Sequence, residues 1–157
     1  MSTHMPILCV GSPHGNDQVG WLVGHLLRDR GMELVHVIRS VDQLMTLLSS
    51  DCRSIIVDAC QSGAPVGTIF RFEWPDPRIA AARGLSSHAI DVPYALRMAE
   101  VLGKLPRKVI LFAIEVESSH PAQEVERTVI AAAHKLADQI EEEIASNGES
   151  LQCMNDL

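Results

Sequence analysis

Apolar residues recur along this chain in two patterns that alternate from one end to the other. Short continuous apolar runs, typical of strands buried on both faces, occur at 7–10, 55–57 and 109–114, and the segment 34–38 is predicted as a further strand. Apolar residues spaced three or four positions apart predict helices over about 19–30, 41–48, 92–102 and 121–146. Strands that alternate with helices favour a parallel sheet with right-handed crossovers, and hence helices on both of its faces.

One segment, 68–74, alternates between apolar and charged residues instead of forming a continuous run. Phe70 and Phe72 fall on one side of it, and Arg71 and Glu73 fall on the other. Period-two alternation of this kind is typical of a half-exposed strand, which indicates an antiparallel strand at an edge of the sheet. The whole pattern predicts a three-layer α/β/α sandwich with a mostly parallel five-stranded sheet and one antiparallel edge strand.

Polar residues mark the ends of several predicted helices. Ser40 and Asp91 precede helical stripes and are candidate N-cap residues. The pair Asn147-Gly148 predicts the end of the last helix. We therefore expect a single α/β domain over 1–146 and a flexible C-terminal tail over 147–157.

Composition and charge narrow the choice of partners. A chain of 157 residues suits one domain with one substantial core. A net charge of −7 and the lack of a Lys/Arg stripe argue against a nucleic-acid partner. No apolar run approaches the roughly 20 residues of a membrane span, and the N-terminus lacks a signal-peptide pattern. Four scattered cysteines without a C-x-x-C suit a reducing compartment, so we expect a cytoplasmic protein. We also expect it to be a monomer.

Three polar side chains are predicted to meet at one edge of the sheet. Ligands in open α/β sheets bind outside the carboxyl ends of the strands. Asp17 follows the first predicted strand, Asp58 ends the third, and His88 ends a connection that must return to the same edge. Two carboxylates in one crevice repel unless a cation lies between them. Carboxylates with an imidazole suit zinc, nickel or iron, and three protein ligands leave coordination positions open.

Each of these residues also has a simpler explanation. Asp17 would serve as an N-cap of the first helix, Asp58 would cap a loop, and His88 would be an ordinary surface histidine. Cys60 remains open as a nucleophile with His88 as its base, against the alternative of a small buried residue. The chain has no G-x-G-x-x-G after its first strand, and Trp21 stands where a phosphate loop has lysine, so no organic cofactor is expected.

These residues carry a resemblance to a known family. The run from Gly11 to Gly20 resembles the glycine-rich first loop of the hydrogenase maturation proteases, with Asn16 in place of an acidic residue and Gln18 in place of a glycine. The pair Asp58-Ala59, followed by a Pro-Val-Gly-Thr turn, resembles the second motif of that family. The triplet that ends in His88 resembles the third motif, and the similarity extends over about 7–144.

The resemblance implies an activity and a set of site residues. The family's metal-binding residues fall on Asp17, Asp58 and His88, which would also be the catalytic residues of an aspartyl-type endopeptidase. Family members remove a C-terminal extension from the nickel-loaded large-subunit precursor of a nickel–iron hydrogenase. The resemblance therefore implies that precursor as partner, with the nickel ion carried by the substrate. A non-catalytic nickel-sensing or chaperone-like module that binds the precursor is the open alternative.

Overall fold

The structure is a computed structural model and describes residues 5–78, 91–117 and 125–155. Within these residues five strands form one sheet: β1 (Ile7–Val10), β2 (Val35–Ile38), β3 (Arg53–Cys60), β4 (Ile69–Glu73) and β5 (Lys108–Glu115). The helical elements are the 3₁₀ turn η1 (Gly15–Gln18) and the helices α1 (Val19–Asp29), α2 (Val41–Leu47), α4 (Val92–Val101) and α5 (Arg127–Asn155).

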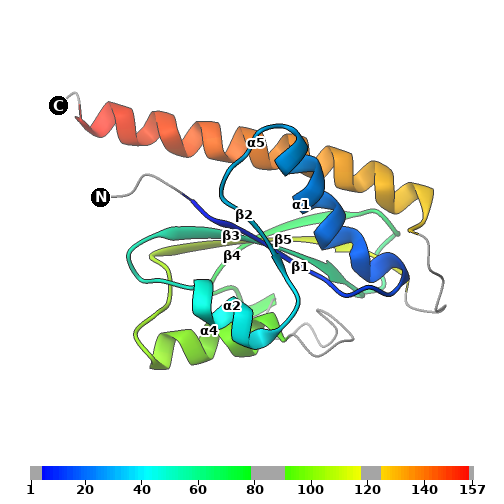
Figure 1. The fold of residues 1–157 in the computed structure, drawn as a ribbon, viewed down its shortest axis with the longest axis horizontal. Coiled ribbons are helices and arrows are strands. Elements are labelled where there is room, and N and C mark those ends of the chain that lie inside the picture. The colour runs from blue at the N-terminus through cyan, green and yellow to red at the C-terminus, as the bar shows by residue number, and fades with distance from the viewer. Residues whose placement is uncertain (1–4, 79–90, 118–124, 156–157) are drawn as a thin grey trace.

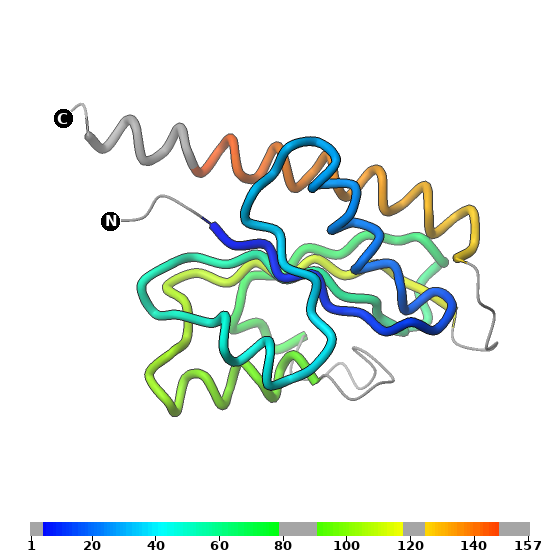
Figure 2. The backbone as a smooth tube through the Cα atoms, in the orientation of Figure 1, coloured from blue at the N-terminus to red at the C-terminus, as the bar shows by residue number. Residues whose placement is uncertain are grey.

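The sheet has the order β2-β1-β3-β5-β4. The first four strands of this order run parallel, and β4 pairs antiparallel with β5 at the edge. The predicted fold class is therefore confirmed, including the antiparallel edge strand. Because β1 lies directly beside β3, with Leu8 opposite Ile56, the chain segments that leave these two strands emerge side by side at one edge of the sheet (Figure 2).

Helices cover the sheet on both faces (Figure 1). Successive side chains of a strand point to opposite faces, so Ile7 and Cys9 join the core under α1 and α5. Leu8 and Val10 join the second core, under α2 and α4. Both faces are therefore apolar, which is why the strands read as continuous apolar runs. Among the described helices, none combines the length and the apolar character that crossing a membrane requires.

Side-chain caps begin two of the helices, as predicted. The Ser40 hydroxyl accepts a hydrogen bond from the Gln43 amide at 3.2 Å, at the start of α2. The Asp91 carboxylate accepts from the Tyr94 amide at 3.0 Å, at the start of α4. Each bond satisfies a donor that the first turn of a helix would otherwise leave without a partner.

The predicted end of the last helix is wrong. α5 continues through Asn147 and Gly148 to Asn155. The Asn147 amide group donates to the Glu143 carbonyl at 2.7 Å and accepts from Arg53 at 3.4 Å, so it bonds within the helix and to β3 instead of capping. A glycine inside a helix costs only about 1 kcal/mol, which the helix tolerates. The division into a domain and a flexible tail stays a prediction.

Candidate active site

Asp58 is a buried carboxyl group with one oxygen left open. β3 extends to Cys60, so Asp58 lies two residues inside the strand and not at its end. The side chain is sealed from solvent, with the residue 2% exposed. One carboxyl oxygen accepts from the Ala59 amide at 2.8 Å, and the other has no hydrogen-bond partner among the described residues. Asp58 therefore does not cap the following loop, because its bonding stops at the next residue.

The surroundings of Asp58 disfavour its charged form. Burial raises the pKa of the Asp58 carboxyl well above its ordinary range, and the Ala59 hydrogen bond opposes this rise. The nearby negative charge of Asp17 raises the pKa of Asp58 further. The carboxyl groups of Asp17 and Asp58 are thus close enough to repel, as the adjacency of β1 and β3 requires.

Asp17 lies in η1, the turn between β1 and α1. The N-cap residue of α1 is Gln18, which makes no side-chain cap bond. The simpler explanation of Asp17 as a helix cap is therefore wrong. Asp17 is partly exposed, whereas Asp58 is sealed, so Asp17 is the carboxyl group of this pair that faces the surface.

Glycines bring this turn close to both strands. Gly15 has a φ of +51°, which an L side chain rarely adopts. A Cβ atom on Gly20 would lie 2.0 Å from the Val10 carbonyl oxygen and 3.3 Å from that of Val57. The first turn of α1 therefore rests on the ends of β1 and β3. Gln18 has a right-handed backbone with φ −73°, so its position needs no glycine.

Asn16 ties the turn to two distant parts of the chain, a role that the sequence did not reveal. Its carbonyl oxygen accepts from the Glu126 amide at 3.0 Å, just before α5. Its amide nitrogen donates to the Glu117 carbonyl at 3.4 Å, just after β5. An aspartate cannot donate the second bond, which gives a physical reason for an amide here. The presence of Asn16 in place of the family's acidic residue was the signal in the sequence that could have pointed to this role.

A second open polar atom lies near Asp58. Within the described residues, the side-chain oxygens that are buried without a partner are those of Ser12 and Asp58. Both residues lie toward the carboxyl ends of β1 and β3, which are neighbours. A buried polar group left without a partner costs about 1–3 kcal/mol. Two such groups at one edge indicate a place where a bound ligand supplies the missing interactions.

Cys60 is not a nucleophile in this arrangement. Its thiol is buried, at 4% exposure, and donates to a Glu115 carboxylate oxygen at 3.2 Å. Burial raises the pKa of the Cys60 thiol, and the hydrogen bond to Glu115 and the charge of that residue raise it further. A protonated, enclosed thiol is unreactive, so the alternative of a small buried residue is correct.

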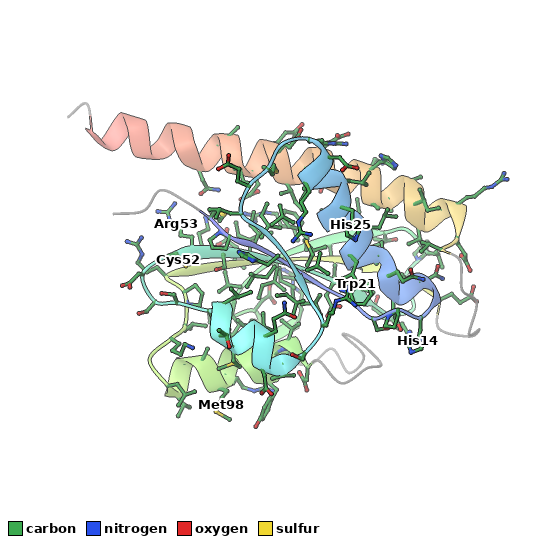
Figure 3. All side chains as sticks on the ribbon, viewed as in Figure 1. His14, Trp21, His25, Cys52, Arg53 and Met98 are labelled. Atoms are coloured by element: carbon green, nitrogen blue, oxygen red, sulfur yellow. The ribbon has the colours of Figure 1, made fainter. Side chains whose placement is uncertain are left out.

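The described residues supply two of the three predicted ligands. His88 lies outside them, so its position relative to Asp17 and Asp58 stays a prediction. In the described part of the chain, no group of three or more His, Cys, Asp or Glu residues could hold a metal ion. Figure 3 shows His14 near the end of β1, and Cys52 with Arg53 at the opposite end of the sheet. Cys52 is therefore remote from the carboxyl pair.

Sequence comparison identifies one family. The family model for hydrogenase maturation proteases matches residues 31–143, which is more than half of the chain. No protein of curated function matches the sequence significantly.

Solved structures with the same fold come from several organisms. The hydrogenase maturating endopeptidase HybD from E. coli is 20% identical, with a TM-score of 0.76, and the match covers 92% of this chain and 94% of that one. The nickel–iron hydrogenase maturation protease HybD from Thermococcus kodakarensis is 18% identical, with a TM-score of 0.72 and coverage of 90% and 99%. The hydrogenase 2 maturation peptidase from Thaumarchaeota archaeon SCGC_AB-539-E09 is 22% identical, with a TM-score of 0.62 and coverage of 90% and 98%. At such identities, the likeness shows the shared fold.

Proposed function

The chain belongs to the hydrogenase maturation protease family, and from that premise we propose that it removes the C-terminal extension from the nickel-loaded large-subunit precursor of a nickel–iron hydrogenase. The observation that carries this proposal is the open oxygen of buried Asp58 beside the carboxyl group of Asp17. Asp58 is buried with an oxygen that has no partner, and the nearby charge of Asp17 disfavours its ionised form. A cation between the two groups removes the repulsion.

The donor set fits a divalent ion carried by the substrate. Asp58 offers one oxygen without a partner, Asp17 offers a second carboxylate, and His88 is the third ligand of the proposal. Carboxylate and imidazole donors suit nickel. The ion is part of the substrate, whose own ligands would complete the coordination. When bound, it would act as a tether that places the precursor's peptide at the site, and correct placement lowers a reaction barrier by several kcal/mol.

The carboxyl groups of Asp58 and Asp17 would have different roles in the reaction. Asp58 is sealed, so its contact is with the cargo ion and not with the peptide. Asp17 is partly exposed, so it is the described carboxylate that reaches the peptide bond. Hydrolysis needs a base that takes a proton from the attacking water and an acid that returns one to the leaving amine. We assign the base to Asp17, whose carboxyl group, once it has taken the proton from the attacking water, would also be the acid that returns it to the leaving amine.

The proposal includes the setting in which the reaction occurs. We expect the protein to act in the cytoplasm as a monomer, with the nickel-loaded precursor as its partner. The net charge of −7 is unsuited to nucleic acid.

The test compares nickel-loaded and nickel-free precursor with one enzyme preparation. We expect a mass loss equal to the extension only for the nickel-loaded precursor, measured by mass spectrometry of the large subunit. Equal cleavage of both forms would refute the proposal that the nickel ion tethers the precursor to the enzyme. Stable binding of the loaded precursor without any mass loss would favour the chaperone-like alternative.

Substitutions of the ligands test the site itself. Asp17→Ala, Asp58→Ala and His88→Ala should each reduce processing by at least about a hundredfold, because misplacing a substrate by about 1 Å already has an effect of that size. Circular dichroism checks that each variant remains folded. Asp51→Ala is a matched control, because Asp51 is an exposed acidic residue just before β3, at the opposite end of that strand from Asp58. Normal processing by all three ligand variants would refute the assignment.

A further inference from the structure

A third carboxyl group lies near the candidate site and has no part in the proposed chemistry. Glu115 is the last residue of β5 and is 2% exposed. One of its carboxylate oxygens accepts from the backbone amides of Ser62 and Gly63, at 2.7 and 3.0 Å. The other accepts from the Ser62 hydroxyl at 2.7 Å and from the Cys60 thiol at 3.2 Å. All four donors come from the end of β3 and the residues that follow it.

The backbone of Glu115 holds the far end of the same loop. Its carbonyl accepts from the Gly67 amide at 2.9 Å, and its amide donates to the Thr68 carbonyl at 2.9 Å. The loop 61–68 joins β3 to β4, and β5 lies between those two strands in the sheet. The loop therefore crosses over the carboxyl end of β5 (Figure 2). Glu115 holds the loop at both ends.

The loop that Glu115 holds borders the candidate site. It begins three residues after Asp58, at the edge where Asp58 and Asp17 lie. On its other side the loop contacts α5, since a Cβ atom on Gly67 would lie 3.0 Å from the Thr128 methyl group. Gly67 has a φ of +90°, so this contact uses a backbone that favours glycine.

Burying a carboxylate costs free energy unless hydrogen bonds replace the lost water, so the burial of Glu115 calls for an explanation. Hydrogen bonds to an ionised acceptor are shorter and about twice as strong as neutral ones. The Glu115 carboxylate receives four bonds from one short segment, so its interactions favour one conformation of the loop. An apolar residue would fill the same space without selecting that conformation.

We propose that Glu115 is a positioning residue that fixes the loop 61–68 as a rigid wall beside the Asp17–Asp58 pair, against which the precursor docks. The identity of the docking partner rests on the proposed function, whereas the fixing of the loop does not. The wall contacts the substrate away from the reacting bond. Its loss should therefore weaken binding equally in the ground and transition states, which raises KM and leaves kcat nearly unchanged.

The experiment uses three variants and one control. Glu115→Ala removes all four bonds. Ser62→Ala removes the hydroxyl that donates to Glu115 and that also accepts from the Ala64 amide at 3.5 Å. Glu115→Gln is the conservative variant, because its side-chain oxygen still accepts from the two amides. Glu143→Gln is the control, because Glu143 pairs with Arg71, a residue of β4, and lies sixteen residues along α5 from the start of that helix.

Three measurements are made on each variant. Amide hydrogen exchange at Ser62 and Gly63 reports the loop, the Kd for the nickel-loaded precursor reports docking, and KM and kcat report processing. For Glu115→Ala we expect the amide exchange rate and the Kd each to increase at least about tenfold, because a hydrogen bond to a charged group is lost. The kcat should stay within about threefold of the wild-type value. Glu115→Gln should recover most of both losses, and the control should match the wild type.

Each contrary result has a clear meaning. Unchanged exchange at Ser62 and Gly63 in Glu115→Ala would overturn the fixing of the loop. Faster amide exchange with an unchanged Kd would refute the proposal that the precursor docks against the loop 61–68. If Glu115→Ala does not fold, Ser62→Ala carries the same test with a smaller expected effect. A wild-type protein that binds the loaded precursor without cutting it refutes the proposed function, while exchange and Kd still decide this inference.

Discussion

Asp58 and Glu115 are buried carboxyl groups of neighbouring strands, and their surroundings act on them in opposite ways. Burial raises the pKa of Asp58 well above its ordinary range, because a single amide bond cannot replace the lost water. Burial also tends to raise the pKa of Glu115, but the bonds from Ser62, Cys60 and Gly63 outweigh it and hold that pKa below its ordinary value. One oxygen of Asp58 therefore has no hydrogen-bond partner, whereas both oxygens of Glu115 have partners.

The first prediction concerns the conflict between stability and function at Asp58. Asp58→Asn removes the ionisable group and keeps an oxygen that accepts from the Ala59 amide. We expect the midpoint of thermal unfolding of the metal-free protein at pH 7 to stay equal or rise, because the amide removes the cost of burying an ionisable carboxyl group. Processing should fall by at least about a hundredfold. A marked loss of stability in this variant would show that the carboxyl group is structural.

At the scale of elements, the site depends on how closely α1 approaches the sheet. The turn η1 carries Asp17, and the first turn of α1 rests on the carbonyl groups of Val10 and Val57. Asn16 holds the same turn from the other side, through Glu117 and Glu126. The distance between Asp17 and Asp58 is thus set by contacts among β1, β3 and α1.

The second prediction tests this close approach. In an unconstrained helix, replacing glycine by alanine stabilises by about 1 kcal/mol. At Gly20 the added Cβ atom would meet the Val10 carbonyl oxygen at 2.0 Å, and backbone atoms must move to relieve the contact. We expect Gly20→Ala to lower the free energy of unfolding by about 1–3 kcal/mol, measured by urea denaturation. A stabilised variant would mean that α1 lies further from the strands.

The third prediction separates a helix cap from the site. Asp91 accepts from the Tyr94 amide at the start of α4, on the face of the sheet opposite α1. Asp91→Ala should lower the free energy of unfolding by about 0.5–2 kcal/mol, as the loss of an N-cap does. Processing at low temperature should stay nearly normal. Processing that vanishes while stability is unchanged would place Asp91 in the site.

At the scale of the whole molecule, two apolar cores stabilise one sheet, and the polar groups gather at its carboxyl edge. The core under α1 and α5 and the core under α2 and α4 are both closed by alternate residues of the same strands. The buried polar residues of the described chain are Ser54, Asp58 and Glu115, and the last two lie toward the carboxyl edge. The two buried carboxyl groups therefore lie where the sheet ends.

The fourth prediction is a pH dependence of stability that arises at Glu115. The pKa of Glu115 is lowered in the folded protein from an ordinary value of 4.5, so its stabilising effect is complete above that pH. As pH falls through the lower, folded-state pKa, the carboxylate takes up a proton and the effect is lost. We expect wild type to lose about 1–3 kcal/mol more than Glu115→Gln between pH 6 and pH 3, by urea denaturation. Parallel curves for the two proteins would contradict it.

The sequence by itself determined the layered fold, because the signals for it are local. Continuous apolar runs, helical stripes and the alternation at Phe70 and Phe72 reflect which faces of each element are buried, and those faces leave only a few topologies. The predicted order of strands is also sufficient to place Asp17 and Asp58 at one edge of the sheet. The caps at Ser40 and Asp91 were readable for the same reason, since a cap involves residues three positions apart.

Only the tertiary structure decided the bonding of the polar atoms. Glu115 bonds to Ser62 across 53 residues, and Asn16 bonds to Glu126 across 110, so no local pattern reveals either contact. The last helix passes through Asn147 because the side chain of that residue finds partners in Glu143 and Arg53. A hydrogen bond depends on positions within a few tenths of an ångström, and packing between distant segments sets those positions. Hydrophobic burial depends only on which face is covered, and for that the sequence is sufficient.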